Sequence, residues 1–170
     1  MAAPPSANIL NISGTWILQG ISWPIRKILS WAGVALHLTQ TSAPSSPGKP
    51  PVTTITAKQT ITPGGFNSEE AYVLDDSVKH ASLPIFGAVS VRARYTPLDE
   101  IDDAELRERL AKDGATVAVQ EFAESKGGEW KTEGVWGFEV IGGERRFTRT
   151  NITTGRGERV LARLVYDYKA

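Results

Sequence analysis

Few polar side chains of this chain combine a chemically useful group with a strand-like setting. His37 lies between leucines in VALHLTQ, Gln59 lies in VTTITAKQTI, and Tyr166 and Tyr168 lie in the C-terminal LARLVYDY. An imidazole can act as a general base near physiological pH, and amide or phenol groups can stabilise charge on a ligand oxygen. These four residues are the catalytic candidates, although a lone histidine in an apolar strand can also be a hydrogen-bonded structural residue.

Aromatic residues share faces with apolar neighbours when side chains are assigned alternately along the strand-like segments. In EWKTEGVWGFEV, Trp136 and Phe138 lie on the face opposite the lysine and glutamates, and Tyr95 lies on the apolar face of AVSVRARYT. We interpret these three as walls of a pocket for an apolar ligand. Arg92 and Arg94 fall on the other face and are expected to meet solvent, since a buried arginine would need a paired anion.

Nine segments have the alternation and composition of strands and are bounded by turn signals such as GGE and TGRGE. They cover residues 12–19, 34–41, 52–61, 66–75, 88–96, 115–124, 130–141, 145–153 and 158–168. Short strands joined by tight turns indicate an antiparallel barrel or sandwich rather than a parallel sheet. We expect one mainly-β domain over residues 1–170, with a flexible N-terminus (1–10) and a mobile proline- and serine-rich loop (42–51).

A helix is predicted over residues 24–32, where apolar side chains follow the spacing of an amphipathic helix and Gly33 can end it. In a small barrel, a helix between the first two strands can lie over an open mouth, and Trp23 and Trp31 would then cap a ligand cavity. Alternatively, this helix only fills an ordinary core. Residues 102–114 also have helical composition but are too charged for a core, so we expect a surface excursion there.

Charge and composition exclude several classes of function. The 19 basic and 19 acidic side chains cancel, so the positive surface that nucleic-acid binding requires is not expected. No segment reaches the roughly 20 apolar residues that cross a bilayer, and MAAPPSAN lacks the features of a signal peptide. We therefore expect a cytoplasmic protein with neither nucleic acid nor stable membrane insertion among its interactions.

Motifs for metals and cofactors are missing as well. Cysteine is absent, and His37 lies far in sequence from His80, which we assign to a loop. This spacing does not match a metal site. The chain has no nucleophile elbow, phosphate-binding loop or dinucleotide fingerprint. We predict no metal and no cofactor, and hydrolase, kinase and dehydrogenase functions have no support.

The tripeptide Gly14-Thr15-Trp16, at the start of the first strand, resembles the G-x-W signature of the calycins, the superfamily of lipocalins and fatty-acid-binding proteins. The resemblance implies a calycin-like barrel of about eight to ten antiparallel strands. It also implies that Trp16 packs across the closed end against a basic residue of a late strand, for which Arg163 is the candidate. An arginine on an indole gains a cation–π contact, so both residues are expected to be structural.

The whole chain also resembles a group of small fungal lipocalin-like proteins. The resembling stretches are QGISWPIRKILSWAGVALHLTQ, LPIFGAVSVRARY, EGVWGFEVIGGERRFTR and RLVYDY. Lipocalin-like barrels of fungal secondary metabolism include cofactor-free cyclases and isomerases, and the resemblance implies such a role here.

Two functions are consistent with these features. The protein could be a cofactor-free cyclase or isomerase that folds a polyketide- or terpenoid-like substrate, or a carrier of a lipophilic molecule; both need an apolar pocket with few polar groups. The Arg-x-Tyr carboxylate clamp of many fatty-acid-binding proteins is altered to RLVY, which places Arg163 and Tyr166 on opposite faces. This departure favours the enzyme.

Overall fold

The protein is a curled antiparallel sheet of ten strands, described here from a computed structural model that covers residues 1–21, 33–44, 46–63, 65–83 and 87–170. The elements are β1 (Gly14–Ile21), β2 (Gly33–Pro44), β3 (Pro51–Thr62), β4 (Phe66–Val73), β5 (Lys79–Leu83), β6 (Gly87–Pro97), the short 3₁₀ helix η1 (Leu98–Glu100), α2 (Ala104–Ala111), β7 (Val117–Ser125), β8 (Trp130–Ile141), β9 (Glu144–Gly155) and β10 (Glu158–Lys169). The expected mainly-β, antiparallel architecture is confirmed, with ten strands among the described residues where about eight to ten were predicted. The helix predicted over residues 24–32, with Trp23 and Trp31, lies outside the described residues.

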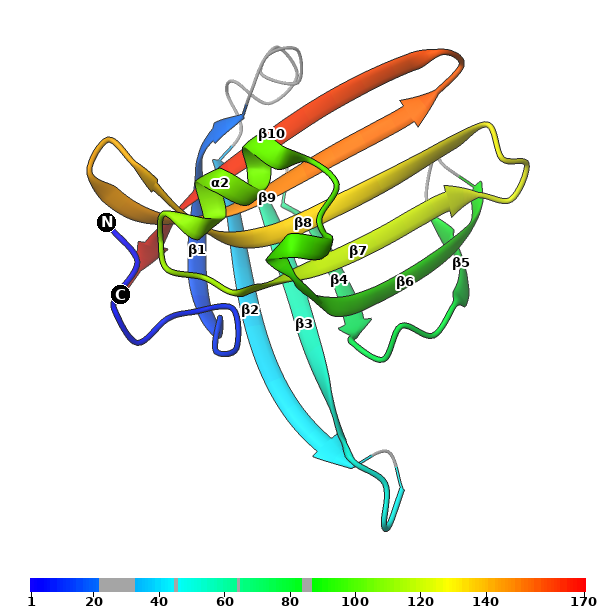
Figure 1. Cartoon of the computed structure of the whole chain (residues 1–170), viewed down its shortest axis with the longest axis horizontal. Helices are drawn as coiled ribbons and strands as arrows, with labels where there is room; N and C mark the ends of the chain where they lie inside the picture. Colours follow the sequence, from blue (N-terminus) through cyan, green and yellow to red (C-terminus); the bar gives the residue numbers. More distant parts are fainter. Residues whose placement is uncertain (22–32, 45, 64, 84–86) are drawn as a thin grey trace.

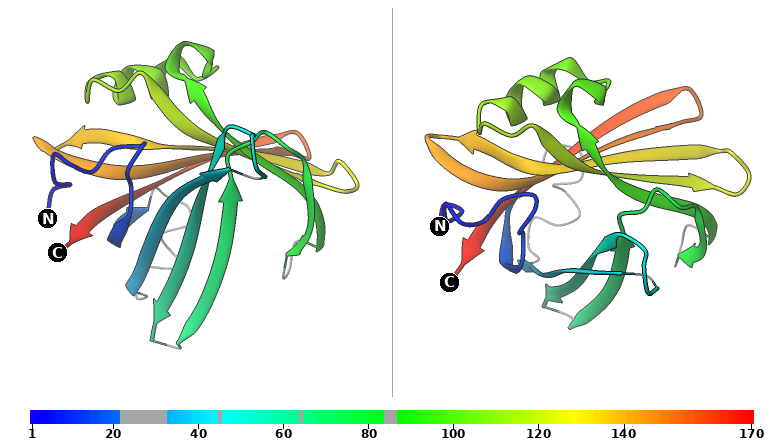
Figure 2. Two further views of the ribbon diagram at one scale, coloured as in Figure 1. Left: turned by 90° about the horizontal axis from the view of Figure 1, so that it is seen from below. Right: turned by 60° about the horizontal axis from the view of Figure 1, so that its bottom comes forward.

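The strands follow the order β4-β3-β2-β1-β10-β9-β8-β7-β6-β5. The first and last strands are therefore neighbours in the middle of the sheet, and the two edges are β4 and β5, which are consecutive in the chain. The sheet curls until β4 approaches β6. Just after the end of β4, the Asp76 N–H donates to the Ala93 carbonyl of β6 at 3.0 Å. The result is a half-barrel with two walls (Figures 1 and 2) and a slot between its edges.

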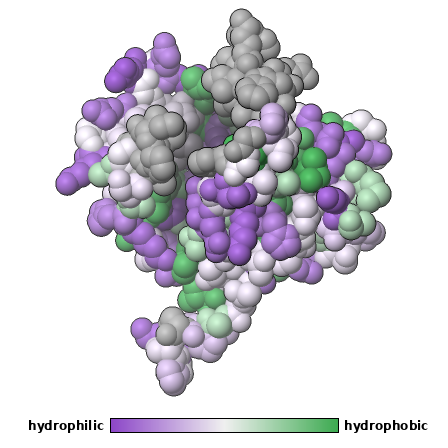
Figure 3. Space-filling view, turned by 180° about the vertical axis from the view of Figure 1, so that it is seen from behind, coloured by the Kyte–Doolittle hydropathy of each residue, from purple (hydrophilic) through white to green (hydrophobic). Residues whose placement is uncertain are grey.

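Two connections differ from the sequence prediction. His80, which we assigned to a loop, lies on the short edge strand β5, where its Nδ1 is 3.1 Å from the Ser90 hydroxyl. The segment is short and polar, so it lacks the alternation that identifies the other strands. The loop predicted over 42–51 is shorter than expected, because β2 and β3 pair as far as Pro44 and Pro51. This hairpin projects from the body of the protein in Figures 1 and 3.

An aromatic cluster fills one end of the interior. Trp16, Trp136, Phe138, Phe147 and Tyr166 are each at most 2% exposed. The Trp16 ring lies 5.8 Å from Phe138 and 5.2 Å from Phe147, measured between centroids. Its indole N–H donates to the Ile12 carbonyl at 3.0 Å, so the polar edge of the buried ring is satisfied.

The first ten residues, for which we expected flexibility, pack over this closed end. Ala3, Ala7 and Ile9 are buried in the aromatic cluster. The Ala3 N–H donates to the Arg145 carbonyl at 2.7 Å, and the Met1 carbonyl accepts from the Tyr168 N–H at 3.0 Å. The segment therefore contributes to the core.

The predicted contact between Trp16 and Arg163 is wrong. Trp16 pairs with Tyr168 in the β1–β10 register, so the even-numbered residues of this part of β10 share its inner face. Arg163 has the opposite parity and lies on the outer face, where its Nε and Nη2 both donate to the Glu139 carboxylate. The G-x-W resemblance correctly placed Trp16 in the core but assigned it the wrong partner.

Helix α2 covers the outer face of the sheet (Figure 2). Its glutamates, Glu105 and Glu108, are exposed as expected, but Leu106 and Leu110 are buried at 1% exposure in a second core with Val135. Gly137 allows this close packing, because a Cβ there would lie 2.5 Å from the Leu110 side chain. The segment is thus a covering helix rather than a surface excursion.

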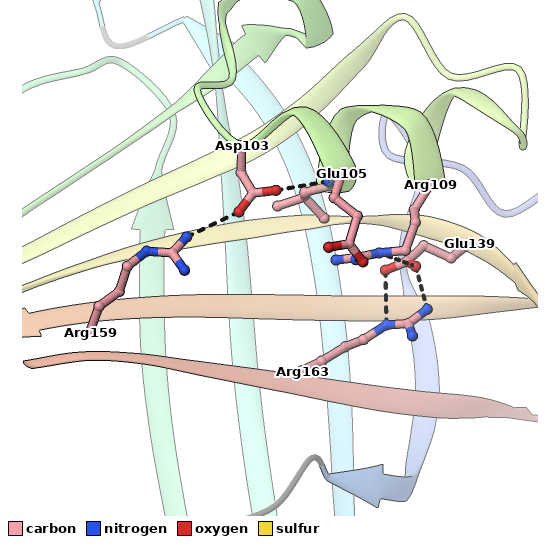
Figure 4. A network of polar contacts seen from close by, with 7 residues as sticks. Asp103, Glu105, Arg109, Glu139, Arg159 and Arg163 are labelled. Carbon is pink, nitrogen blue, oxygen red and sulfur yellow. Dashed lines mark hydrogen bonds and ion pairs between the residues drawn. The ribbon is translucent and has the colours of Figure 1, made fainter.

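Ion pairs fix α2 to the sheet (Figure 4). The carboxylate of Glu139, 1% exposed, binds Arg163 and lies 3.1 Å from the Arg109 Nε of the helix. At the helix start, Asp103 accepts from the Leu106 N–H at 3.0 Å and pairs with Arg159. The backbone hydrogen bond, helped by the arginine, lowers the pKa of Asp103.

We predict that Glu139→Ala destabilises the fold by about 3 kcal/mol, because it leaves two arginines without their buried countercharge. Glu144→Ala is the control: this half-exposed carboxylate pairs with Arg146 on the surface, and its loss should cost under about 1 kcal/mol. Urea unfolding measures both. Equal losses would show that Glu139 does not anchor the helix.

Candidate functional site

A cavity of about 350 Å³ occupies the slot between the two edges of the sheet. It is lined by Glu70, Ala71, Tyr72, Val73, Ser77, Lys79, Ala81, Val91, Arg92, Ala93, Glu121, Phe122, Ala123 and Thr132. The strands that contribute are β4 on one wall, β5 at the edge, and β6, β7 and β8 on the other wall. Apolar side chains alternate with a few polar ones, as is usual for small-molecule sites.

A larger groove of about 800 Å³ lies mainly on the outer face, beside the start of α2, and includes Asp103, Lys131 and Arg159. Its charged groups are accessible to solvent or already paired with one another. We place the candidate site at the inner cavity, because Glu121, which lines it, belongs to a largely buried ion pair.

Arg149 lies behind the cavity wall and contacts two of its lining residues, Glu121 and Tyr72. It lies opposite Trp136 in the β8–β9 register, and its guanidinium lies over the indole ring, with Cζ 4.1 Å from the centroid. Its Nη2 donates to Glu121 Oε1 at 3.1 Å and to the Tyr72 hydroxyl at 3.4 Å. The Arg149 and Glu121 side chains are 13% and 16% exposed, so the pair is largely shielded from water.

Tyr72 connects the two walls of the half-barrel. It comes from the edge strand β4, and its ring meets Trp136 edge-on at 4.8 Å between centroids. Its hydroxyl accepts from Arg149 and donates to Glu70 Oε2. The phenol thus sits within a chain of polar groups at the cavity surface.

Burial raises the pKa of Tyr72 well above its ordinary value, and the negative charge of Glu121 adds to this while Arg149 opposes it. Burial likewise raises the pKa of Tyr166, against the lowering effect of Arg149. Both phenols therefore remain protonated, and able to donate, throughout the physiological pH range.

Gly134 makes room for the ion pair. It lies directly opposite Glu121 in the β7–β8 register. A Cβ at Gly134 would lie 2.4 Å from Glu121 Oε1 and 2.5 Å from its Cγ. The missing side chain lets the glutamate lie flat across β8 and reach Arg149.

Of the predicted polar candidates, His37 is not in the interior. Leu36 and Leu38, on either side of it, are 1% exposed and face inward, so alternation directs His37 outward. There its Nδ1 lies 3.1 Å from the Thr15 hydroxyl. This position supports the structural interpretation of His37 and contradicts an interior general base.

Gln59 and Tyr95 lie on the inner side of the sheet but outside the described cavity lining. Gln59 pairs with Leu36 in the register and so shares its inward face. The Tyr95 hydroxyl accepts from the Gln40 amide at 2.7 Å, a second link between the walls. Burial raises the pKa of Tyr95 as well.

The remaining predicted residues, two pocket walls and two catalytic candidates, form packed core beside the cavity. Trp136 is fully buried, and its ring face packs against the Arg149 guanidinium. Phe138 and Tyr166 are 2% exposed. Tyr168 packs edge-on against Trp16 at 5.1 Å. None of these four contributes to the cavity surface, so the packing favours a supporting role over direct ligand contact.

The sequence analysis missed Arg149, Glu121 and Tyr72. A signal for Arg149 exists in RRFTRT, where alternation places it on the same face as Phe147. An arginine on an aromatic face needs a buried partner, but the sequence does not reveal which one. The partners lie 28 and 77 residues away and are brought close only by the curl of the sheet.

Among the described residues, no three carboxylate, histidine or cysteine side chains lie close enough together to hold a metal ion. No helix in this part of the chain is both long and apolar enough to cross a membrane.

Gly134→Ala should destabilise the fold by about 1–3 kcal/mol, since the added methyl group overpacks the site and displaces Glu121. Gly20→Ala, also in a strand, is the matched control, because nothing lies within 4 Å of its added Cβ. Its effect should stay within about 0.5 kcal/mol. Chemical unfolding and tryptophan fluorescence measure the change; equal stability of the two variants would exclude the tight contact at Gly134.

Raised tyrosine pKa values predict a loss of stability in alkali. Below pH 10 the phenols are neutral in both the folded and the unfolded state. Above that value the unfolded chain releases protons that Tyr72 and Tyr166 retain when folded, so stability falls as pH rises. Tyr72→Phe and Tyr166→Phe should each make the fall above pH 10 shallower than in the parent. Unchanged slopes would contradict burial of the phenols.

Comparison with known proteins identifies two curated relatives. No protein-family model matches the chain. The curated "Probable pericyclase scpY" of Mollisia scopiformis is 30% identical over 154 residues, which cover 89% of this chain and 79% of that protein. "Pericyclase pydY" of Acremonium sp is 25% identical over 184 residues, with 99% and 97% covered.

Among solved structures, As-p18, an extracellular fatty acid binding protein, aligns over 92% of this chain and 95% of its own, with a TM-score of 0.46 and 11% identity. The resemblance to fungal lipocalin-like proteins is confirmed by the curated relatives. Given 30% identity across most of its length, the chain belongs to the same family as the pericyclase of Mollisia scopiformis.

Proposed function

We propose that the protein is a cofactor-free pericyclase that folds a hydrophobic, polyketide- or terpenoid-like polyene in the slot cavity and catalyses its intramolecular cyclisation. The observation that carries this proposal is that Tyr72 and Glu121 line the cavity of about 350 Å³ and that both accept hydrogen bonds from Arg149, which lies behind them. The relatives named as pericyclases support it.

The chemistry needs little from the protein except position and polarisation. In an intramolecular cycloaddition, two new σ bonds replace two π bonds within one molecule, and no proton, electron or leaving group is exchanged. The barrier consists largely of the entropy lost when a flexible chain folds so that its reacting carbons meet. A cavity that holds the folded conformer supplies this part.

Small apolar side chains shape the space for the chain. The wall formed by β6 and β7 contributes Val91, Ala93 and Ala123 to the cavity lining, together with Phe122. Alanines leave room there, and the stiff β-sheet behind them limits the conformations that a bound polyene can adopt.

Tyr72 is the group proposed to polarise the substrate. It lines the cavity, and its hydroxyl now donates to Glu70. A substrate carbonyl that replaced Glu70 as acceptor would be polarised by the phenol, which lowers the barrier when that carbonyl is conjugated to the reacting alkene. Arg149 donates to the same oxygen and makes the O–H a stronger donor.

The alternative function is storage of a lipophilic ligand without chemistry. An apolar cavity alone would serve that purpose. A buried arginine and glutamate require desolvation that apolar binding does not repay, and this favours the enzyme.

The test uses a linear trienone in which a conjugated diene is tethered to an enone. We expect the purified protein to accelerate its cyclisation and to favour one stereoisomer, measured by chiral chromatography. Tyr72→Phe should lower the catalysed rate about tenfold to a hundredfold, since removal of one positioned donor has effects of this order or larger.

Thr60→Val is the control, because it also removes a hydroxyl, but from the outer side of β3, where Thr60 donates to Asn67. This variant should retain the parent rate. Binding of the trienone without acceleration would favour the carrier, and a Tyr72→Phe rate equal to that of the parent would remove Tyr72 from the mechanism.

A further inference from the structure

Glu121 has an unused acceptor at the cavity. Its Oε1 accepts from Arg149 at 3.1 Å, whereas Oε2 accepts no hydrogen bond from any described residue. The side chain lines the cavity, and Oε2 does not belong to the fully buried polar atoms that lack a partner. A bound molecule can therefore reach this oxygen.

The donor and the acceptor of the site are close together. A single atom, Arg149 Nη2, contacts both the Tyr72 hydroxyl, at 3.4 Å, and Glu121, at 3.1 Å. The cavity wall thus presents a phenol O–H beside a carboxylate oxygen. The carbonyl and N–H of an amide present the complementary pair, an acceptor beside a donor.

The charges around the phenol oppose a carboxylate ligand. Glu121 neutralises Arg149, and within the described part of the chain Glu70 has no cationic partner. Two further cations line the cavity: Arg92 is paired with Asp76 at 3.1 Å, and Lys79 is exposed. Solvent screens Lys79 and the equally exposed Glu70, so neither of these charges dominates. Among the described residues that line or adjoin the cavity, the other cations are already paired, and a carboxylate placed against this wall would lose its hydration without gaining a countercharge.

We propose that the polar end of the substrate is an amide whose N–H donates to Glu121 Oε2 while its carbonyl accepts from Tyr72, and that the cavity rejects carboxylates. This inference rests on the proposed function, because it names the substrate class of the same site. Two adjacent hydrogen bonds fix the polar end in position and direction, and the polyene then extends along the apolar wall.

Three probes of equal chain length test it: a linear conjugated trienoic acid, its primary amide and its dimethyl amide. Titration calorimetry with the parent protein should show the primary amide binding at least tenfold more tightly than the other two. The dimethyl amide keeps the carbonyl but has no N–H, and the acid replaces the N–H with a negative charge.

Glu121→Gln gives a result that misfolding cannot mimic. It frees Arg149 from its countercharge, so the trienoic acid should bind at least tenfold more tightly than it does to the parent, and the preference for the amide should shrink. Glu124→Gln, the same change on the outer face of β7, should leave all three affinities as in the parent.

Similar affinities of the three probes for the parent, tightest binding of the acid, or binding of none would each overturn the inference. Accelerated cyclisation of the trienone without a preference for the amide would overturn this inference alone. A preference for the amide without any cyclisation would refute the proposed function and leave the recognition of the amide standing.

Discussion

A guanidinium group buried among aromatic rings must be neutralised, and this requirement organises the interior of the half-barrel. Glu121 supplies the countercharge to Arg149, Gly134 leaves the space for it, Trp136 supplies a ring face, and Tyr72 brings the edge strand to the pair. One cation thereby holds four strands in a fixed relation. Neighbouring strands of the sheet are joined by backbone hydrogen bonds. Across the slot, the distance between the two walls depends on the contacts of Arg149, Glu121 and Tyr72 and on the hydrogen bond between Asp76 and Ala93.

The outer face has the opposite arrangement. Glu139, a buried anion, is neutralised there by Arg109 of the helix and Arg163 of the last strand. The central strands therefore carry a buried cation on the inner face and a buried anion on the outer face. Each fixes a separate element, the edge strand inside and α2 outside, and each is conditional on its partners, because removal of one charge takes away the buried countercharge of another.

The sequence was informative wherever a local pattern decides the structure. Alternation identified nine strands and the inward aromatic face, since both depend on neighbours within one segment. It failed for β5, which is short and polar. The expected contact of Arg163 with Trp16 came from the G-x-W resemblance. Alternation had already placed Arg163 on the face opposite Tyr166, where it pairs with Glu139. Alternation missed the centre of the site, because the contact of Arg149 with Tyr72 joins residues 77 positions apart. Such contacts arise only when the sheet curls.

The two edges of the sheet belong to consecutive strands joined by the short connection between Val73 and Lys79. In a barrel closed by hydrogen bonds all round, strand number and stagger fix the diameter. Among the described residues no ladder of backbone hydrogen bonds spans the slot, so its width follows from the side chains that bridge it and from the hydrogen bond between the Asp76 N–H and the Ala93 carbonyl. A chain with this strand order can therefore change the width of the slot by exchanging a few side chains, without altering the pairing of a single strand.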